Sequence, residues 1–170
     1  MDAIGRLLGG LGERIAAVVL ALSAAQFPVY YTAYSNTLAG ARVEAEARYL
    51  ELQREAAALD LSVQAFIEHH EQSPDGVFQA SGRMHRTTLE HFLRYTSMEQ
   101  ALRDANAWER PLALAKNFDR ALAEATHFEP GLPLSAEGAA YAFAGLLLAW
   151  VLTALVGAVL GPRRPRPALR

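Results

Sequence analysis

Five histidines are the side chains of this sequence best suited to chemistry, because imidazole binds metal ions and titrates near neutral pH. His69 and His70 are adjacent, so on a helix they point about 100° apart and cannot bind one metal from one face. His85 and His91 are six residues apart, off the i, i+4 spacing that suits shared ligation, and His127 stands alone. We predict no metal site, and we expect the adjacent pair to interact with a helix end. The alternatives are a metal site assembled across helices and a pH-responsive helix junction.

Other reactive groups give no catalytic signature. The hydroxyl residues Ser81, Thr87, Thr88 and Ser97 have no glycine elbow or base at a recognisable spacing. The carboxylates lie among arginines at helical spacing, as Glu44 does with Arg48, which is typical of solvated helix faces. The N-terminal glycines precede no strand and no lysine–serine pair, and cysteine is absent. We predict a protein that is not an enzyme, with no catalytic residues and no cofactor.

Charge is distributed unevenly along the 170 residues. The net charge is only −2, but residues 35–136 hold 15 of the 18 acidic and 10 of the 16 basic side chains. This mildly acidic middle is typical of a solvated protein surface, and it is not basic enough to bind nucleic acid. The two ends are apolar instead.

Two apolar segments predict membrane-spanning helices. Residues 138–160 carry no charge. At about 1.5 Å per residue they would extend roughly 35 Å, enough to cross a hydrocarbon layer of about 30 Å. Residues 15–41 are also uncharged, with Pro28 at an expected kink. We set the spans at residues 15–34 and 135–161. Three tyrosines are expected at the membrane interface: Tyr30, Tyr31 and Tyr34.

The arginines near the spans predict the orientation. Four of them close the chain with no acid between them and are expected to anchor the second span in the cytoplasm: Arg163, Arg164, Arg166 and Arg170. Residues 1–14 and 162–170 are then cytoplasmic, and residues 35–134 lie in the periplasm, outside a bacterial inner membrane. The alternative is a cleaved signal peptide ending near the small residues 23–25, although the charged segment before the apolar core is long for one.

The middle segment predicts a helical hairpin or bundle. Apolar residues recur every seven positions from Leu38 through Leu59 to Phe66, with a second set between them, which is the a/d pattern of a packed helix. Proline, glycine and aspartate at 72–76 end this helix. We predict three helices, at residues 38–72, 77–105 and 111–127. No segment alternates with a strand period. The predicted fold class is therefore an all-α membrane protein, with two transmembrane helices flanking an extracytoplasmic helical hairpin or bundle.

Several blocks of the sequence resemble one known family. They are Gln26-Phe27-Pro28 with Tyr34, Leu38-Ala39-Gly40 with Val43-Glu44-Ala45, residues 66–70 with 75–78 and Gly82, and residues 128–135 with Glu137-Gly138. The last block is the most specific, and the match covers most of the chain. The sequence resembles the uncharacterised bacterial family called domain of unknown function 2937, which has paired glycines where this chain has Ala39-Gly40. The resemblance implies a two-span inner-membrane protein with an extracytoplasmic helical region, and it implies no activity.

Small residues recur at four-residue spacing on both predicted spans. They are Ala17, Ala21 and Ala25 in the first span and Ala149, Thr153, Gly157 and Gly161 in the second. Small side chains let helix backbones approach closely in lipid, where packing drives association. The two sets would either pack on each other within the chain or dock on another integral membrane protein or a second copy.

These observations favour a non-enzymatic accessory or scaffolding protein of the inner membrane. It would associate with itself or be a subunit of a larger membrane complex, with the lipid bilayer as a partner and nucleic acid excluded. The alternative is a periplasmic sensor or small-ligand-binding module. His85, His91 or Tyr95 would then line a pocket, and a closed, polar-lined cavity would favour this alternative.

Overall fold

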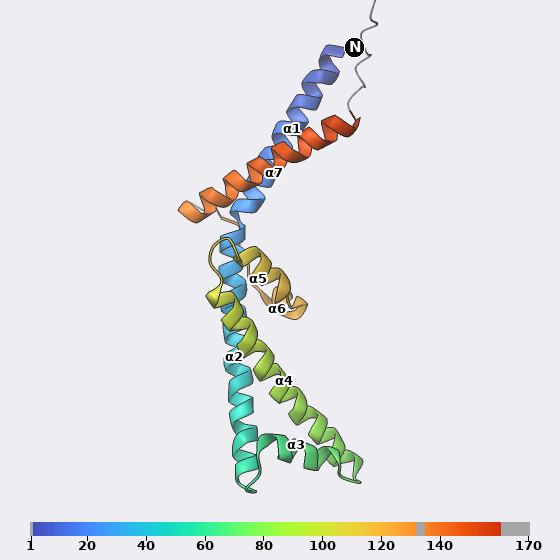
Figure 1. Cartoon of the computed structure of the whole chain (residues 1–170), viewed down its shortest axis with the longest axis vertical. Helices are drawn as coiled ribbons and strands as arrows, with labels where there is room; N and C mark the ends of the chain where they lie inside the picture. Colours follow the sequence, from blue (N-terminus) through green and yellow to red (C-terminus); the bar gives the residue numbers. More distant parts are fainter. Residues whose placement is uncertain (1, 132–134, 161–170) are drawn as a thin grey trace, which may run out of the picture. The chain divides into compact units, whose positions relative to one another are not determined.

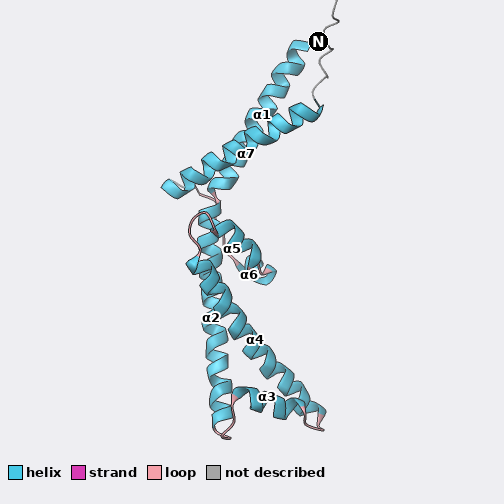
Figure 2. Ribbon diagram, viewed as in Figure 1, coloured by secondary structure: helices cyan, strands magenta, loops and turns pink. Residues whose placement is uncertain are grey.

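The protein is helical in all the parts that the structure describes. This structure, a computed structural model, describes residues 2–131 and 135–160, with side-chain surroundings from residue 12 to residue 156, apart from residue 13 and residues 132–134. Seven helices and no strand occur in the described segments (Figure 1, Figure 2). The predicted all-α class is therefore confirmed.

Two compact units make up the chain. The terminal unit combines Met1–Tyr30 with Glu129–Arg170, and the middle unit is Tyr31–Phe128. Two helical stretches of the described chain are long and apolar enough to cross a membrane: Arg14–Ala57 and Ala136–Val156. The prediction of two possible transmembrane helices is thus supported by length and composition.

The terminal unit consists of α1 (Asp2–Ala25) and α7 (Ala136–Leu160), which cross each other (Figure 1). Large apolar side chains point outward from both helices, including Val18, Leu22, Leu147, Trp150 and Leu155. Two helices alone cannot bury so much apolar surface, and a patch of this kind marks an interaction with lipid or protein. Their backbone groups are paired within each helix, as a lipid surrounding requires.

The first apolar segment is interrupted once, at Gln26. There α1 ends and α2 (Phe27–Ala57) begins, so Pro28 lies in the first turn of a helix, where its missing N–H removes no helical hydrogen bond. The Gln26 side-chain amide donates to the carbonyl oxygen of Gly131 at 2.7 Å and accepts from the Gly131 N–H at 3.1 Å. Phe27 packs on Tyr141 of α7, with ring centroids 5.1 Å apart. The start of α2 is therefore tied to the linker that precedes α7.

The helix predicted over residues 38–72 is two helices. The first, α2, gives way to a turn in which Asp60 has a φ of 56°, and α3 (Val63–Glu71) follows. In this turn the Leu61 N–H donates to Ala56 O and the Asp60 N–H donates to Ala57 O, which is the Schellman pattern of helix ends. Ser62 then caps α3 by accepting from the Ala65 N–H at 3.1 Å. Leu59, expected on the packed face, lies in this turn and is 62% exposed.

The second predicted helix matches α4 (Gly76–Asp104) to within one residue at each end. The Asp75 side chain caps it by accepting from the Val77 N–H at 2.8 Å. The third predicted helix, residues 111–127, is instead two short ones, α5 (Arg110–Lys116) and α6 (Arg120–Ala125). Asp119 interrupts it because its carboxylate accepts from the first N–H groups of α6 and so starts a new helix.

Two tyrosines expected at the membrane interface belong to the core of the middle unit. The Tyr31 hydroxyl donates to Leu102 O, at the end of α4, at 2.5 Å. The fully buried Tyr34 hydroxyl donates to Asn117 O at 3.1 Å and accepts from the Asp119 N–H at 2.9 Å. These bonds attach the ends of α4, α5 and α6 to α2. The interfacial role predicted for Tyr31 and Tyr34 is corrected, because both rings are buried against protein.

Candidate functional site

The described small-residue positions are buried or half-buried in the terminal unit, in which α1 and α7 cross. Ala21 and Ala25 of α1 and Ala149 of α7 are buried, and Ala17 and Thr153 are half-buried. Their burial agrees with packing of the two sets on each other. The surroundings of Gly157, Gly161 and the predicted anchor Arg163, Arg164, Arg166 and Arg170 lie outside the described residues.

Gly145, which was not among the predicted small-residue positions, lies in close contact with α1 at this crossing. A Cβ atom at Gly145 would lie 2.8 Å from Leu20 O and 2.9 Å from the Ala21 Cα. The two backbones therefore touch at this glycine. It lies four residues before Ala149, so extending the small-residue spacing by one step would have found it.

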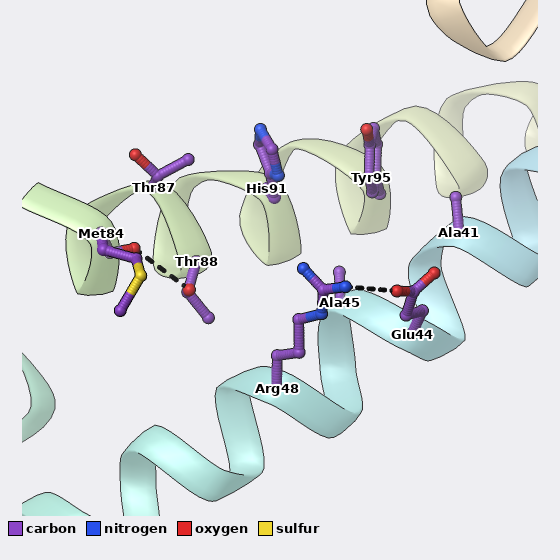
Figure 3. A pocket seen from close by; sticks show the side chains of 9 residues that line it. All are labelled: Ala41, Glu44, Ala45, Arg48, Met84, Thr87, Thr88, His91 and Tyr95. Atoms are coloured by element: carbon purple, nitrogen blue, oxygen red, sulfur yellow. Dashed lines mark hydrogen bonds and ion pairs between the residues drawn. The ribbon is translucent and has the colours of Figure 1, made fainter.

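A surface groove between α2 and α4 is the candidate ligand site of the middle unit (Figure 3). Its volume is about 380 Å³, within the range of about 300–1,000 Å³ that is typical of small-molecule sites. On the α2 side, the small side chains of Ala41 and Ala45 leave room, and Glu44 and Arg48 contribute a carboxylate and a guanidinium group. The lining from α4 comprises Met84, Thr87, Thr88, His91 and Tyr95.

The polar groups of this groove are largely paired with one another. Arg48 binds Glu44 at 2.5 Å, and both side chains are about two-thirds exposed to solvent. The Thr88 hydroxyl donates to Met84 O at 3.2 Å (Figure 3). Of the predicted lining residues, His91 and Tyr95 are among those that line the groove, and their rings stack with centroids 5.6 Å apart, whereas His85 does not line it. An open groove of this kind can hold a small polar molecule.

Side chains rather than close backbones connect α2 to α4 beside the groove. Tyr49 stacks on Phe92 with ring centroids 4.4 Å apart and planes 6° from parallel. Arg42 binds Glu99 of α4 at 2.6 Å, and Glu99 also binds Arg103 at 2.6 Å. Both sides of the groove are therefore held at a defined spacing.

A pair of histidines meets where α3 packs on α4. The rings of His70 and His85 lie 5.4 Å apart, edge to face at 80°. Both contact Phe66 of α3, with centroids 4.3 Å and 5.4 Å away respectively. Sequence spacing did not reveal this pair, because the two residues are 15 positions apart on different helices. Among residues 2–131 and 135–160, no cluster of three or more potential metal ligands forms.

One ion pair fixes the same junction. The Arg86 guanidinium binds both carboxylate oxygens of Glu71, with the Nε contact at 2.7 Å. Hydrogen bonding from Arg86 lowers the pKa of Glu71, and the same bond raises the pKa of Arg86. The pKa of His85 is lowered from 6.5, first by burial and then by the neighbouring His70. Burial and His70 both therefore favour the neutral form of His85.

Comparison with known proteins places the chain in one family. Residues 8–166 match the family model described as protein of unknown function (DUF2937). No curated protein and no solved structure gives a significant match. Two blocks that carried the resemblance, Gln26-Phe27-Pro28 and the linker before α7, are in contact through Gln26 and Gly131. Because the match extends over nearly the whole chain, the protein belongs to the DUF2937 family.

Proposed function

We propose that this protein is a non-enzymatic accessory or scaffolding component of the bacterial inner membrane. In this proposal α1 and α7 form the membrane anchor, both termini are cytoplasmic, and the middle unit binds a partner in the periplasm. The observation that carries the proposal is a second, exposed apolar face on α2. The following contacts support it.

The packed face of α2 is buried at Leu38, Ala45 and Leu52. On the opposite side of the helix, Val43 and Leu50 are 56% and 46% exposed. Gly40 and Ala47 share that side and are also exposed, and a Cβ at Gly40 would meet no atom within 4 Å. These residues follow the alternating three- and four-residue spacing of a helix–helix seam. We call Gly40, Val43, Ala47 and Leu50 the outer face of α2.

The charges beside the outer face favour a different protein over a second copy. Glu46 and Glu51 lie on its two edges, at the positions that meet across the seam of a parallel helix pair. Two copies anchored in one membrane and aligned in parallel would place these carboxylates opposite each other. Carboxylates placed opposite each other would repel. A partner helix with an apolar seam and basic edges would avoid this repulsion, so we propose a partner of that kind.

A charge placed on the outer face tests the proposal. We expect Leu50→Glu to abolish a crosslink from a photoreactive residue at position 47 to a second protein in living cells, while the chain stays membrane-bound. The matched control is Leu93→Glu on α4, a leucine 56% exposed that lies away from the outer face. The proposal is wrong if position 47 gives no crosslink, or if both variants reduce it equally.

The groove supports a second candidate, a periplasmic sensor for a small polar molecule. Its carboxylate, guanidinium, imidazole and phenol groups could bind a ligand that carries one positive and one negative charge. If so, such a ligand should raise the melting temperature of the detergent-solubilised chain, and Arg48→Gln should remove that rise while Arg54→Gln retains it. A shift equal in both variants would argue against a ligand site in the groove.

A further inference from the structure

The junction between α3 and α4 is packed too tightly to absorb a structural change. A Cβ atom at Gly82 of α4 would lie 2.8 Å from the Glu71 backbone nitrogen and 3.0 Å from the His70 Cβ. The end of α3 therefore rests directly on the backbone of α4. Interiors packed to this degree have little free volume and transmit strain, so repulsion between groups at the junction acts directly on the contact between α3 and α4.

Each histidine at this junction has one ring nitrogen engaged. His70 Nδ1 lies 2.9 Å from Phe66 O, where an imidazole N–H donates to the carbonyl. His85 Nε2 lies 3.1 Å from the Ser81 hydroxyl oxygen. A neutral imidazole nitrogen can donate or accept this hydrogen bond, depending on the tautomer. On its other side His70 faces the ring of Phe78, with centroids 5.7 Å apart. Neither imidazole is bound to a carboxylate that would hold it in the charged form.

The surrounding charges come from all three helices near the pair. On α3, His69 has its ring centroid 6.4 Å from that of His70, and the Glu71 carboxylate is bound by Arg86. On α4, the charge of Arg83 also lowers the pKa of Glu71. The charges of Glu90 and of the α3 residue Glu68 raise the pKa of Arg86. On α2, the charge of Glu55 raises the pKa of His85, but burial and His70 lower that pKa by more. A proton added to His85 is therefore poorly compensated.

We propose that the α3–α4 junction is a proton-sensitive latch, in which protonation at the His70–His85 pair loosens α3 from α4. Two imidazolium ions with ring centroids 5.4 Å apart would repel each other in a half-buried site. α3 connects the C-terminal end of α2 to the N-terminal end of α4 (Figure 1). Loosening α3 therefore allows the distance between α2 and α4 to change. Acidification would thus change the groove without any ligand. The latch does not depend on the proposed scaffolding role.

The direction of the pH effect follows from the lowered pKa of His85. When α3 is detached, His85 has its ordinary pKa of 6.5 and binds a proton more readily than in the packed junction. The packed state is therefore fully favoured above that pH. It loses stability as the pH falls through 6.5 towards the lowered pKa, and below that value the loss is complete.

Hydrogen–deuterium exchange on the full chain in lipid nanodiscs tests the latch. After correction for the intrinsic exchange rate, we expect the protection of residues 63–71 to fall between pH 7.5 and pH 5.5, the range in which imidazole titrates. Residues 31–50 of α2, which belong to the same compact unit as α3 and α4, report on the rest of that unit and should keep their protection. His85→Gln should remove most of the pH dependence, and the exposed neighbour substitution His69→Gln should retain it. Equal protection at both pH values overturns the proposal, as does a pH response that survives in His85→Gln.

A titration of the unaltered chain covers the case in which His85→Gln does not fold. With ¹³C-labelled histidine, nuclear magnetic resonance should show one imidazole titrating below the ordinary value. That signal should move in His70→Gln, because a neutral neighbour removes part of the repulsion. If every histidine titrates at or above 6.5, the latch is wrong.

Discussion

Single residues set how closely the helices of this protein approach one another. Gly145 lets α7 touch the backbone of α1, and Gly82 lets α3 rest on α4. Tyr34 acts differently, because its one hydroxyl satisfies both a carbonyl and an N–H in the segment between α5 and α6. The fold therefore depends on glycines, which have no side chain, at two helix contacts, and on the Tyr34 hydroxyl at a third.

We predict that Gly145→Leu destabilises the terminal unit by about 1–3 kcal/mol, since the new side chain must displace the backbone of α1. Ala144→Leu is the matched control, because it adds a similar volume at an exposed position of the same helix. Thermal unfolding in detergent, followed by circular dichroism, measures both. Equal melting temperatures for the two variants would contradict the close crossing.

We predict that Tyr34→Phe lowers the free energy of unfolding by about 1–3 kcal/mol, because it leaves the Asp119 N–H and the Asn117 carbonyl without their buried partner. Tyr49→Phe keeps its stack on Phe92 and should be nearly neutral. Chemical denaturation monitored by fluorescence compares them. A neutral Tyr34→Phe would show that water replaces the hydroxyl.

At the scale of elements, the helix ends divide the middle unit into short and long pieces. The Schellman turn after α2 and the Asp119 cap before α6 each satisfy backbone groups that a continuous helix would have paired internally. The break at Asp60 lets Phe66 and Ile67 fold back onto Leu52 and Ala56.

The left-handed backbone at Asp60 gives an element-scale prediction. Asp60→Gly should raise stability by up to about 1 kcal/mol because glycine adopts a φ of 56° without a Cβ clash. Asp60→Val should lower stability, since branching at Cβ worsens that clash. Melting temperatures of the two variants would differ in opposite directions from that of the unaltered chain. A destabilised Asp60→Gly would mean that the carboxylate itself holds the turn.

At the scale of the whole molecule, two units with unlike surfaces share one chain. The terminal unit exposes mainly apolar side chains, whereas the middle unit carries most of the charged residues, some of them in ion pairs such as Arg42–Glu99 and Arg94–Asp119. A lipid environment for the first and an aqueous one for the second would satisfy both surfaces. This contrast supports the proposed anchor and periplasmic unit.

The absence of cysteine makes the proposed topology testable with single labels. We expect a membrane-impermeant maleimide added to intact spheroplasts to label Gln100→Cys and to leave Ala168→Cys unlabelled until the cells are lysed. Ala144→Cys, which points outward from the apolar helix α7, should resist labelling in both conditions. Labelling of Ala168→Cys in intact spheroplasts would reverse the proposed orientation.

The sequence by itself determined the helical class, the two apolar segments and the bounds of α4, because these follow from composition, periodicity and caps within a few residues. It did not predict the break at Asp60, since an aspartate in the left-handed region gives no glycine or proline signal and the seven-residue repeat continues through it. Only the tertiary structure decided that Gly145 touches α1, that Tyr34 is buried and that His70 meets His85. These contacts join residues on different helices, and their geometry depends on where each helix ends and how the helices cross.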